Sequence, residues 1–247
     1  DAMHGVGWMH RDVKLENVLL CGREGEPDCH SIKLIDWGLA HQHQLTSEGE
    51  AVPEMLRSRC GSRSYMSPEV TNREHCSKVG YDGFAADVWS LGVCLFAMHL
   101  GFFPFEHADP SVDWRARKVV EAQEAGRSGM KTILGFYPPN KQSARMSAPL
   151  IALLDRMLVF DPQQRATLHE VLDSAWLAPH LFACRAPGGC LDRVSLSASR
   201  PCLTATSGDS TMQSFESDLG SGWVPTTSDV GSVSRSSGHD LWVATES

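Results

Sequence analysis

Two short stretches of the sequence carry the residue types that phosphoryl transfer requires. The first contains Asp12, Lys14 and Asn17, and the second begins with Asp36. Carboxylate and amide oxygens are the ligands that Mg²⁺ prefers, which makes Asn17 and Asp36 candidate metal ligands. Asp12 is then the candidate catalytic base for an attacking hydroxyl, and Lys14 can neutralise charge on the transferred phosphoryl oxygens.

Two predicted strands bring these stretches together. Residues 18–20 and 32–35 are short aliphatic runs, and the segment between them, 21–31, is rich in Gly, Glu and Asp. This pattern predicts an antiparallel hairpin with a surface loop. Because Asn17 directly precedes the first strand and Asp36 directly follows the second, the hairpin places both at the same end of a small sheet.

The remaining apolar segments predict helices. Apolar residues surround the whole helical circumference of 85–100, as in a helix buried at the centre of a domain. Ser147 and Pro149 predict the start of a further helix with one apolar face. Thr167 and Glu170 form a capping-box pattern that opens another short helix. The predicted fold class is mainly α, with one small β-hairpin that carries the candidate site.

The first motif resembles the catalytic loop of the eukaryotic protein kinase family. It reads HRDVKLEN and starts with His10 and Arg11. The resemblance implies that Asp12 is the catalytic base and Asn17 a magnesium ligand. The presence of Lys14 in this loop is typical of kinases that phosphorylate serine and threonine. The resemblance covers the chain from about residue 3 to residue 182.

The second motif is similar to the Asp-Phe-Gly motif of the same family. Asp36 matches the magnesium-binding aspartate, which also contacts the phosphates of ATP, and Gly38 matches the glycine. Trp37 replaces the usual Phe, as a bulkier packing variant. Leu19 matches the residue that packs beneath the adenine ring. The resemblance therefore implies ATP and Mg²⁺ as cofactors.

Further motifs resemble the activation segment and the helices that follow it. Ser62 matches the hydroxyl residue that touches the catalytic aspartate and lysine. Glu69 stands in Ser-Pro-Glu, where the family has Ala-Pro-Glu, and is expected to pair with Arg165. Asp87 matches the aspartate that holds the backbone of the catalytic loop. Ser58 occupies the place of a regulatory phospho-threonine in the calmodulin-dependent and AMP-activated kinase group.

These matches imply partners as well as chemistry. An upstream kinase that phosphorylates Ser58 is expected, with the phosphate pairing with Arg11. Glu16 matches a position that contacts a substrate arginine, which indicates protein substrates with basic residues around the target. The expected reaction is transfer of the γ-phosphoryl group of ATP to protein serine or threonine.

The chain divides into two predicted regions. Residues 1–182 contain the periodic apolar segments, whereas 183–247 are rich in Ser, Thr and Gly without apolar periodicity. Such a segment cannot bury enough surface to offset the entropy of ordering, which predicts a disordered tail. No Gly-rich loop or strand lysine precedes the catalytic-loop motif. We therefore expect 1–182 to be a C-terminal lobe without its N-terminal lobe, and to be almost inactive alone.

Two other functional classes remain open at this point. A truncated pseudokinase could serve as a scaffold lobe that binds partners without catalysis. Retention of Asp12, Lys14, Asn17 and Asp36 argues against it, because scaffolding requires none of them. The sequence upstream of the chain distinguishes the two. A phosphotransferase for small molecules is disfavoured by residues 61–69, which resemble the peptide-binding part of an activation segment.

Composition excludes further classes. The net charge of −8 argues against a broad surface for nucleic acid or acidic lipid. The longest apolar stretch, 91–105, is interrupted and shorter than the roughly 20 residues that span a bilayer. The eight cysteines include no Cys-x-x-Cys pair, which favours reduced thiols. We expect an intracellular monomer, cytoplasmic or nuclear, that binds neither nucleic acid nor membrane.

Overall fold

The computed structural model of the chain describes part of the sequence, all of it within the first of two units, residues 1–196. The described residues are 2–21, 31–44, 46–47, 52, 54–138 and 146–179. The tail predicted at 183–247 lies outside the described residues, so its disorder stays a prediction. Most of the predicted hairpin loop, residues 22–30, also lies outside the described residues.

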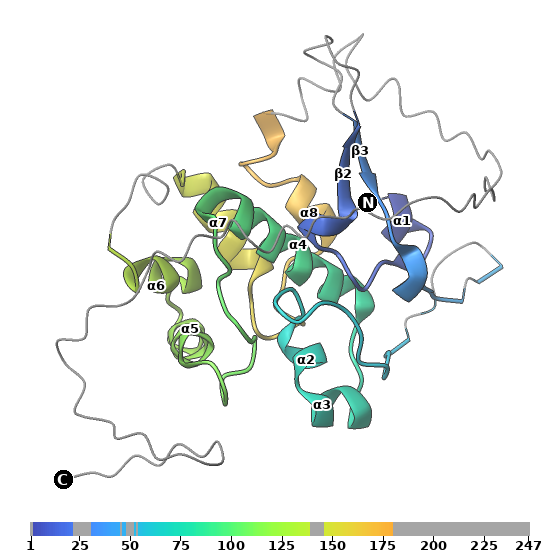
Figure 1. Cartoon of the computed structure of the whole chain (residues 1–247), viewed down its shortest axis with the longest axis horizontal. Helices are drawn as coiled ribbons and strands as arrows, with labels where there is room; N and C mark the ends of the chain where they lie inside the picture. The colour runs from blue at the N-terminus through green and yellow to red at the C-terminus, as the bar shows by residue number, and fades with distance from the viewer. Residues whose placement is uncertain are drawn as a thin grey trace, which may run out of the picture. The chain divides into compact units, whose positions relative to one another are not determined.

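Helices are the most frequent regular elements of the described part (Figure 1). The α-helices are α1 (Ala2–Gly5), α2 (Pro68–Thr71), α3 (Arg73–Lys78), α4 (Gly83–Leu100), α5 (Trp114–Glu124), α6 (Gly129–Gly135), α7 (Ala148–Met157) and α8 (Leu168–Leu172). Two short 3₁₀ helices carry motif residues: η1 (Leu15–Asn17) and η2 (Trp37–Leu39). The predicted mainly-α class is therefore found in the described residues.

The predicted hairpin is present as an antiparallel pair of strands. Strands β2 (Val18–Cys21) and β3 (Ser31–Leu34) pair with Val18 opposite Leu34 and Cys21 opposite Ser31. The second strand ends at Leu34, one residue earlier than the pattern suggests. The hairpin thus brings its two flanking turns to one end, as the order of the motifs requires.

The sequence patterns did not predict a second, smaller sheet. A second two-stranded sheet joins β1 (Trp8–Met9) to β4 (His41–Gln42), with Trp8 opposite Gln42 and Met9 opposite His41. Each strand has two residues, which is too short for the alternation of apolar and polar residues that marks a strand. This sheet ties the segment before the first motif to the segment after the second.

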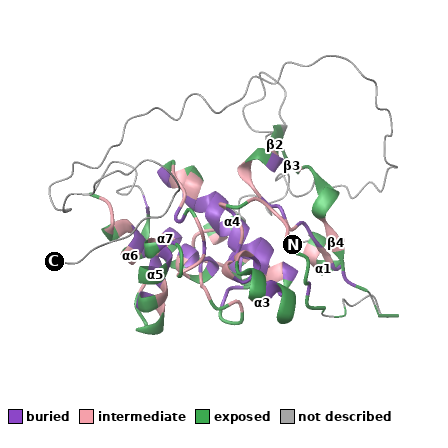
Figure 2. Ribbon diagram, turned by 60° about the horizontal axis from the view of Figure 1, so that its bottom comes forward, coloured by how far each residue is buried: buried purple, intermediate pink, exposed green. Residues whose placement is uncertain are grey.

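Helix α4 forms the centre of the core and lies against α7 (Figure 1). It begins after Asp82, whose carboxylate accepts a hydrogen bond from the Phe84 N–H (2.8 Å), and it ends at Gly101. The φ of Gly101 is 78°, in the left-handed region that favours glycine. Figure 2 shows α4 mostly buried, which confirms the predicted central helix.

Among the described helices, α4 alone is long and apolar enough to cross a bilayer by length and composition. Its mean hydropathy is 1.4, and 61% of it is buried inside the fold. Large core side chains, including those of Trp89 and Phe96, lie on it and are fully buried. A helix with this much of its surface packed against its own domain is explained by its place in the core.

The two predicted helix starts are confirmed. Ser147 caps α7 and accepts a hydrogen bond from the Leu150 N–H. Thr167 caps α8, and Glu170 completes the capping box by accepting a bond from the Thr167 N–H at 2.8 Å. These are local signals within three residues, which is why the sequence reveals them.

Candidate active site

The buried carboxylate of Asp12 lies between the first motif and the activation segment. The Ser62 N–H donates to its Oδ1 (2.8 Å), and Lys14 Nζ contacts its Oδ2 (2.9 Å). Lys14 Nζ also donates to Ser62 Oγ at 2.9 Å. Gly61 permits this approach, because it has a φ of 105° and a Cβ there would lie 2.7 Å from the Arg11 carbonyl oxygen. The structure therefore brings Asp12, Lys14 and Ser62 together.

Opposing effects act on the pKa of Asp12. Burial raises this pKa, but the hydrogen bonds from Lys14 and Ser62 outweigh burial and hold it below its ordinary value. Asp12 is therefore a carboxylate at neutral pH. Its contribution to stability is present above the unfolded-state pKa and is lost as the pH falls through the lower folded-state pKa.

Asn17, the last residue of η1, is also buried. Its side-chain Nδ2 donates to the Asp12 carbonyl oxygen (3.0 Å) and lies 3.4 Å from Asp12 Oδ2. This orientation leaves the amide oxygen as the atom that can act as a ligand. The Ile35 N–H donates to the Asn17 carbonyl oxygen at 2.9 Å. The first motif is thus joined to the residue directly before Asp36.

Asp36 has a left-handed backbone, with φ 61° and ψ 68°, and begins the turn that contains η2. Its side chain is exposed. A Cβ at Gly38 would lie 3.4 Å from Asp36 Oδ1, so this glycine leaves space beside the carboxylate. No hydrogen bond between described residues links the Asp36 carboxylate to Asp12 or Asn17. The backbone pairing at the hairpin end joins these two turns without a direct contact of the Asp36 carboxylate.

His10 and Trp37 fix the two turns against each other. The buried His10 ring places Nε2 3.0 Å from the Ile35 carbonyl oxygen, and its edge meets the Trp37 ring with centroids 4.7 Å apart. Trp37 donates from its indole nitrogen to the Leu34 carbonyl oxygen at 3.0 Å. The indole therefore makes a hydrogen bond that a phenyl ring at this position could not make, consistent with a packing variant.

Asp87 of α4 holds the backbone of the first motif. Its buried carboxylate accepts hydrogen bonds from the N–H groups of His10 (2.7 Å) and Arg11 (2.8 Å). Arg11 has a φ of 65°, an unfavourable conformation for a residue with a side chain. Two charge-assisted hydrogen bonds at this point stabilise the strained turn. His4 Nε2, 3.1 Å from Asp87 Oδ2, is a further contact that the sequence patterns do not reveal.

Arg11 connects the first motif to Ser58 in the activation segment. The guanidinium donates from one NH group to Ser58 Oγ (2.8 Å) and from Nε to the Leu39 carbonyl oxygen (2.6 Å). Tyr81 donates its hydroxyl to the Ser58 carbonyl oxygen at 3.0 Å. Ser58 is exposed. The predicted pairing partner of a phosphate on Ser58 therefore already contacts its hydroxyl.

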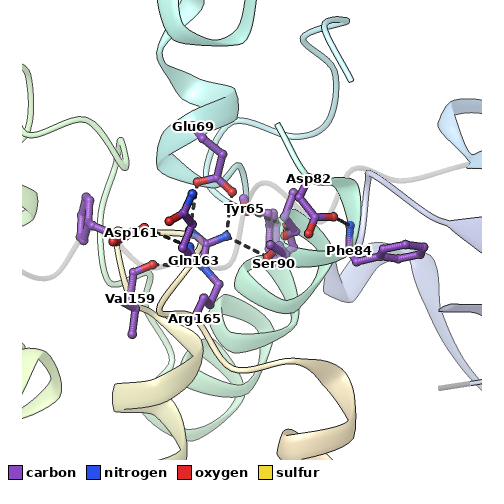
Figure 3. Close-up of polar contacts among 12 residues, drawn as sticks. Tyr65, Glu69, Asp82, Phe84, Ser90, Val159, Asp161, Gln163 and Arg165 are labelled. Atoms are coloured by element: carbon purple, nitrogen blue, oxygen red, sulfur yellow. Dashed lines mark hydrogen bonds and ion pairs between the residues drawn. The ribbon is translucent and has the colours of Figure 1, made fainter. Parts of the chain in front are cut away.

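Glu69 and Arg165 form a buried, two-pronged ion pair (Figure 3). The two contacts are 2.7 Å (Nη1 to Oε1) and 2.9 Å (Nη2 to Oε2). Arg165 also donates to the carbonyl oxygens of Ala85 (2.8 Å) and Val159 (3.0 Å). Its guanidinium lies 5.1 Å from the centre of the Trp89 ring. The pair thus fastens the end of the activation segment to α4 and the segment before α8.

Leu19 and Glu16 are the remaining predicted site residues. Leu19, on β2, is 46% exposed, and Leu20 and Ile32 of the same hairpin are exposed as well. Glu16 accepts a hydrogen bond from the Tyr65 hydroxyl (3.0 Å). Burial, and then the Glu16 carboxylate, raise the pKa of Tyr65. The role of Tyr65 is not visible in the sequence, because 49 residues separate the partners.

Comparison with known proteins identifies the family. Residues 1–177 match the family described as "Protein kinase domain". An abscisic acid-inducible protein kinase of Triticum aestivum is 34% identical over 178 residues, 72% of this chain and 45% of the relative. CBL-interacting serine/threonine-protein kinase 16 of Arabidopsis thaliana is 34% identical over 179 residues, 71% of this chain and 32% of the relative.

A third relative, CBL-interacting protein kinase 11 of Oryza sativa, is 30% identical over 241 residues, 98% of this chain and 41% of the relative. The chain spans less than half the length of these curated relatives. The resemblance seen in the motifs is therefore confirmed across the described fold. The chain belongs to the protein kinase family, and within it to the serine/threonine kinases of the calmodulin-dependent and AMP-activated group.

Proposed function

We propose that this chain forms the C-terminal lobe of a serine/threonine protein kinase, which transfers the γ-phosphoryl group of ATP to a protein hydroxyl. The observation that carries the proposal is the Asp12 carboxylate, buried and held by Lys14 Nζ and the Ser62 N–H. A kinase substrate hydroxyl needs an ionised acceptor beside a cation that stabilises the transferred group. A scaffold lobe, the alternative function, has no use for this arrangement.

The site residues fit Mg²⁺. Mg²⁺ prefers oxygen ligands and is held in kinases by one or two protein groups together with phosphates. The Asn17 amide oxygen is directed away from its Nδ2 contact with Asp12, and the Asp36 carboxylate is exposed one residue beyond the Ile35–Asn17 backbone pair. Asn17 and Asp36 would hold the ion, which supplies positive charge to the phosphate oxygens. Leu19 offers an exposed apolar surface for the adenine ring.

In the proposed reaction, Asp12 orients the substrate serine or threonine hydroxyl and accepts its proton. The hydroxyl oxygen bonds to the γ-phosphorus, while the bond from that phosphorus to the bridging oxygen of ADP breaks. Lys14, 2.9 Å from Asp12 Oδ2, lies where it can stabilise charge on the moving phosphoryl oxygens. Ser62 couples both side chains to the segment on which a peptide substrate would lie.

Labelled ATP tests this function in the protein encoded by the complete gene. Transfer of the γ-phosphate to serine or threonine of a basic peptide is expected, and removal of Mg²⁺ with a chelator should abolish it, because the phosphate charge is then unmatched. Restored Mg²⁺ should restore the rate. Magnesium-dependent ATP binding without any transfer would instead support the scaffold function.

The substrate preference is part of the same proposal. Glu16 directs Oε2 to the Tyr65 hydroxyl, and the residue is exposed, so its carboxylate can also receive a substrate arginine. We propose protein substrates with basic residues near the target, phosphorylated in the cytoplasm or nucleus. Peptides in which the arginines are replaced by alanine should therefore be poorer substrates.

Ser58→Ala should lower the activity of the complete protein by about tenfold or more if an upstream kinase activates it. Phosphate on Ser58 adds charge-assisted hydrogen bonds to Arg11, which already donates to the Ser58 hydroxyl at 2.8 Å. Loss of one such bond, about 1.5–3 kcal/mol, shifts the ordered population of the segment about tenfold or more. Intact-mass analysis detects the phosphate, and rate measurements detect the loss.

Ser77→Ala is the matched control for this change. Ser77 is also an exposed serine, on α3, and its hydroxyl donates to the Glu74 carbonyl oxygen at 3.2 Å. It contacts neither Arg11 nor the first motif, so the activity should not change. Full activity in the Ser58→Ala protein would remove Ser58 as a regulatory site.

A further inference from the structure

A second cluster of ligand-type side chains lies outside the kinase site. His41 Nε2 is 3.3 Å from Glu54 Oε2, and His43 Nδ1 is 3.9 Å from the same oxygen. All three atoms lie within 4.8 Å of one another. His41 and His43 are separated by one residue, so an extended backbone directs both to the same side. Glu54 comes from the activation segment and approaches them from a different part of the chain.

One member of this cluster is a buried polar group that lacks a hydrogen bond. The His43 side chain is 2% exposed, and its Nδ1 is among the buried nitrogen and oxygen atoms of the described residues without a hydrogen-bond partner. The His43 ring makes an edge-to-face contact with the Phe84 ring, with centroids 5.0 Å apart. The backbone N–H of His43 donates to the Gly7 carbonyl oxygen at 2.9 Å. A fixed, buried imidazole whose nitrogen is directed at a second imidazole and a carboxylate is arranged as a metal ligand would be.

We propose that His41, His43 and Glu54 bind a divalent transition-metal ion, with Zn²⁺ the ion that best fits the ligand set. Two imidazoles and one carboxylate are typical zinc ligands, with bonds of about 2.0–2.2 Å. Tetrahedral bonds of that length separate ligand atoms by about 3.4 Å. The two histidine–carboxylate separations of 3.3 Å and 3.9 Å are close to this value, and the two imidazole nitrogens, within 4.8 Å of each other, reach it by side-chain rotation.

The exposure of the ligands fits an ion that enters from solvent. The side chain of Glu54 is 54% exposed and that of His41 is 33% exposed, whereas His43 forms the closed inner wall. Three protein ligands leave a fourth position for water. The site is distinct from the Mg²⁺ ligands Asn17 and Asp36, which offer only oxygen atoms. Imidazole nitrogen favours zinc over magnesium.

The ion would link the activation segment to the sheet formed by β1 and β4. Glu54 lies two residues before Leu56, which exchanges backbone hydrogen bonds with Tyr81 (2.8 and 2.9 Å). His41 lies on β4, which pairs with β1 directly before the first motif. A bond from Glu54 to these histidines therefore links the activation segment to the sheet whose other strand, β1, leads into the first motif.

Calorimetric titration of the full chain with Zn²⁺, in a reducing buffer, tests the site. One equivalent should bind, and the melting temperature should rise because the ion binds the folded chain. His41→Ala and Glu54→Gln should each weaken binding by about 100-fold or more, beyond the roughly 10–100-fold cost of losing a residue that only orients a ligand. Both positions are at least partly exposed, so these variants should fold.

His169→Ala is the matched control. His169 lies 3.4 Å from the Asp173 carboxylate at the exposed end of α8, a histidine–carboxylate pair that has no third ligand among the described residues. Its removal should leave the affinity unchanged. Co²⁺ used in place of Zn²⁺ should give the weak visible bands of nitrogen and oxygen ligation. Unchanged zinc affinity in both His41→Ala and Glu54→Gln, or a strong near-ultraviolet thiolate band with Co²⁺, would overturn the proposal.

Discussion

Asp12→Asn is expected to reduce phosphoryl transfer by about 10²–10⁴-fold in the complete protein, the range that a positioned general base contributes. The amide has the size of the carboxylate, so its oxygen can still accept the Ser62 N–H bond of 2.8 Å. It cannot accept a proton, and Lys14 Nζ, 2.9 Å from Asp12 Oδ2, loses its counter-charge. Initial rates at saturating ATP and peptide measure the loss.

Asp113→Asn is the matched control for this change. Asp113 is also buried, and hydrogen bonds from Arg115 and from backbone N–H groups outweigh the effect of its burial, so its pKa too is lowered. It caps α5 at a distance in sequence from the motifs. The control should lose stability but keep its turnover per folded molecule. Equal losses of turnover in both variants would assign the Asp12 effect to folding rather than to chemistry.

The pH profile is a further test of the role of Asp12. Because the Asp12 pKa lies below its ordinary value, the carboxylate stays ionised through the neutral range. Its protonation should therefore reduce the rate only at acid pH, below the ordinary aspartate range near 4. A loss of rate centred near neutral pH would show that another group limits the reaction.

Local signals were sufficient to predict part of this fold. The caps at Ser147 and Thr167 and the buried circumference of 85–100 each depend on residues within a few positions, and all three are found in the structure. The helices α5 and α6 were not among the predicted elements. Neither was the Asp82 cap, although aspartate is a preferred N-cap residue and offered a local signal for the start of α4.

The prediction of the candidate site depended on a different kind of information. Residue type and order identified Asp12, Asn17 and Asp36 and the hairpin that joins their turns. The bond from Ser62 to Asp12 spans 50 residues, and the pair of Arg165 and Glu69 spans 96. Such contacts leave no periodic trace along the chain, so only the resemblance to a known family could suggest them. The histidine and glutamate cluster was missed because no motif combines those residues.

Arg165→Met should destabilise the described domain by about 3–5 kcal/mol, because it leaves the Glu69 charge buried without its partner. The side chains of the pair are 0% and 3% exposed, and Arg165 also supplies hydrogen bonds to the carbonyl oxygens of Ala85 and Val159. Methionine fills a similar volume but donates no hydrogen bonds. Urea unfolding, followed by circular dichroism of the full chain, measures the change.

A second variant decides whether charge or packing causes the loss. The double change Glu69→Leu with Arg165→Met removes both charges, so it should recover part of the stability that Arg165→Met loses. Arg156→Met is the control, since Arg156 pairs with Glu170 at 2.7 Å but both side chains are about half exposed. Solvent screens that pair, and its loss should cost far less. Glu69→Leu alone completes the comparison. If the double variant loses as much stability as Glu69→Leu and Arg165→Met lose together, the two charges do not interact. The contact between the activation segment and α4 then depends on packing around Trp89.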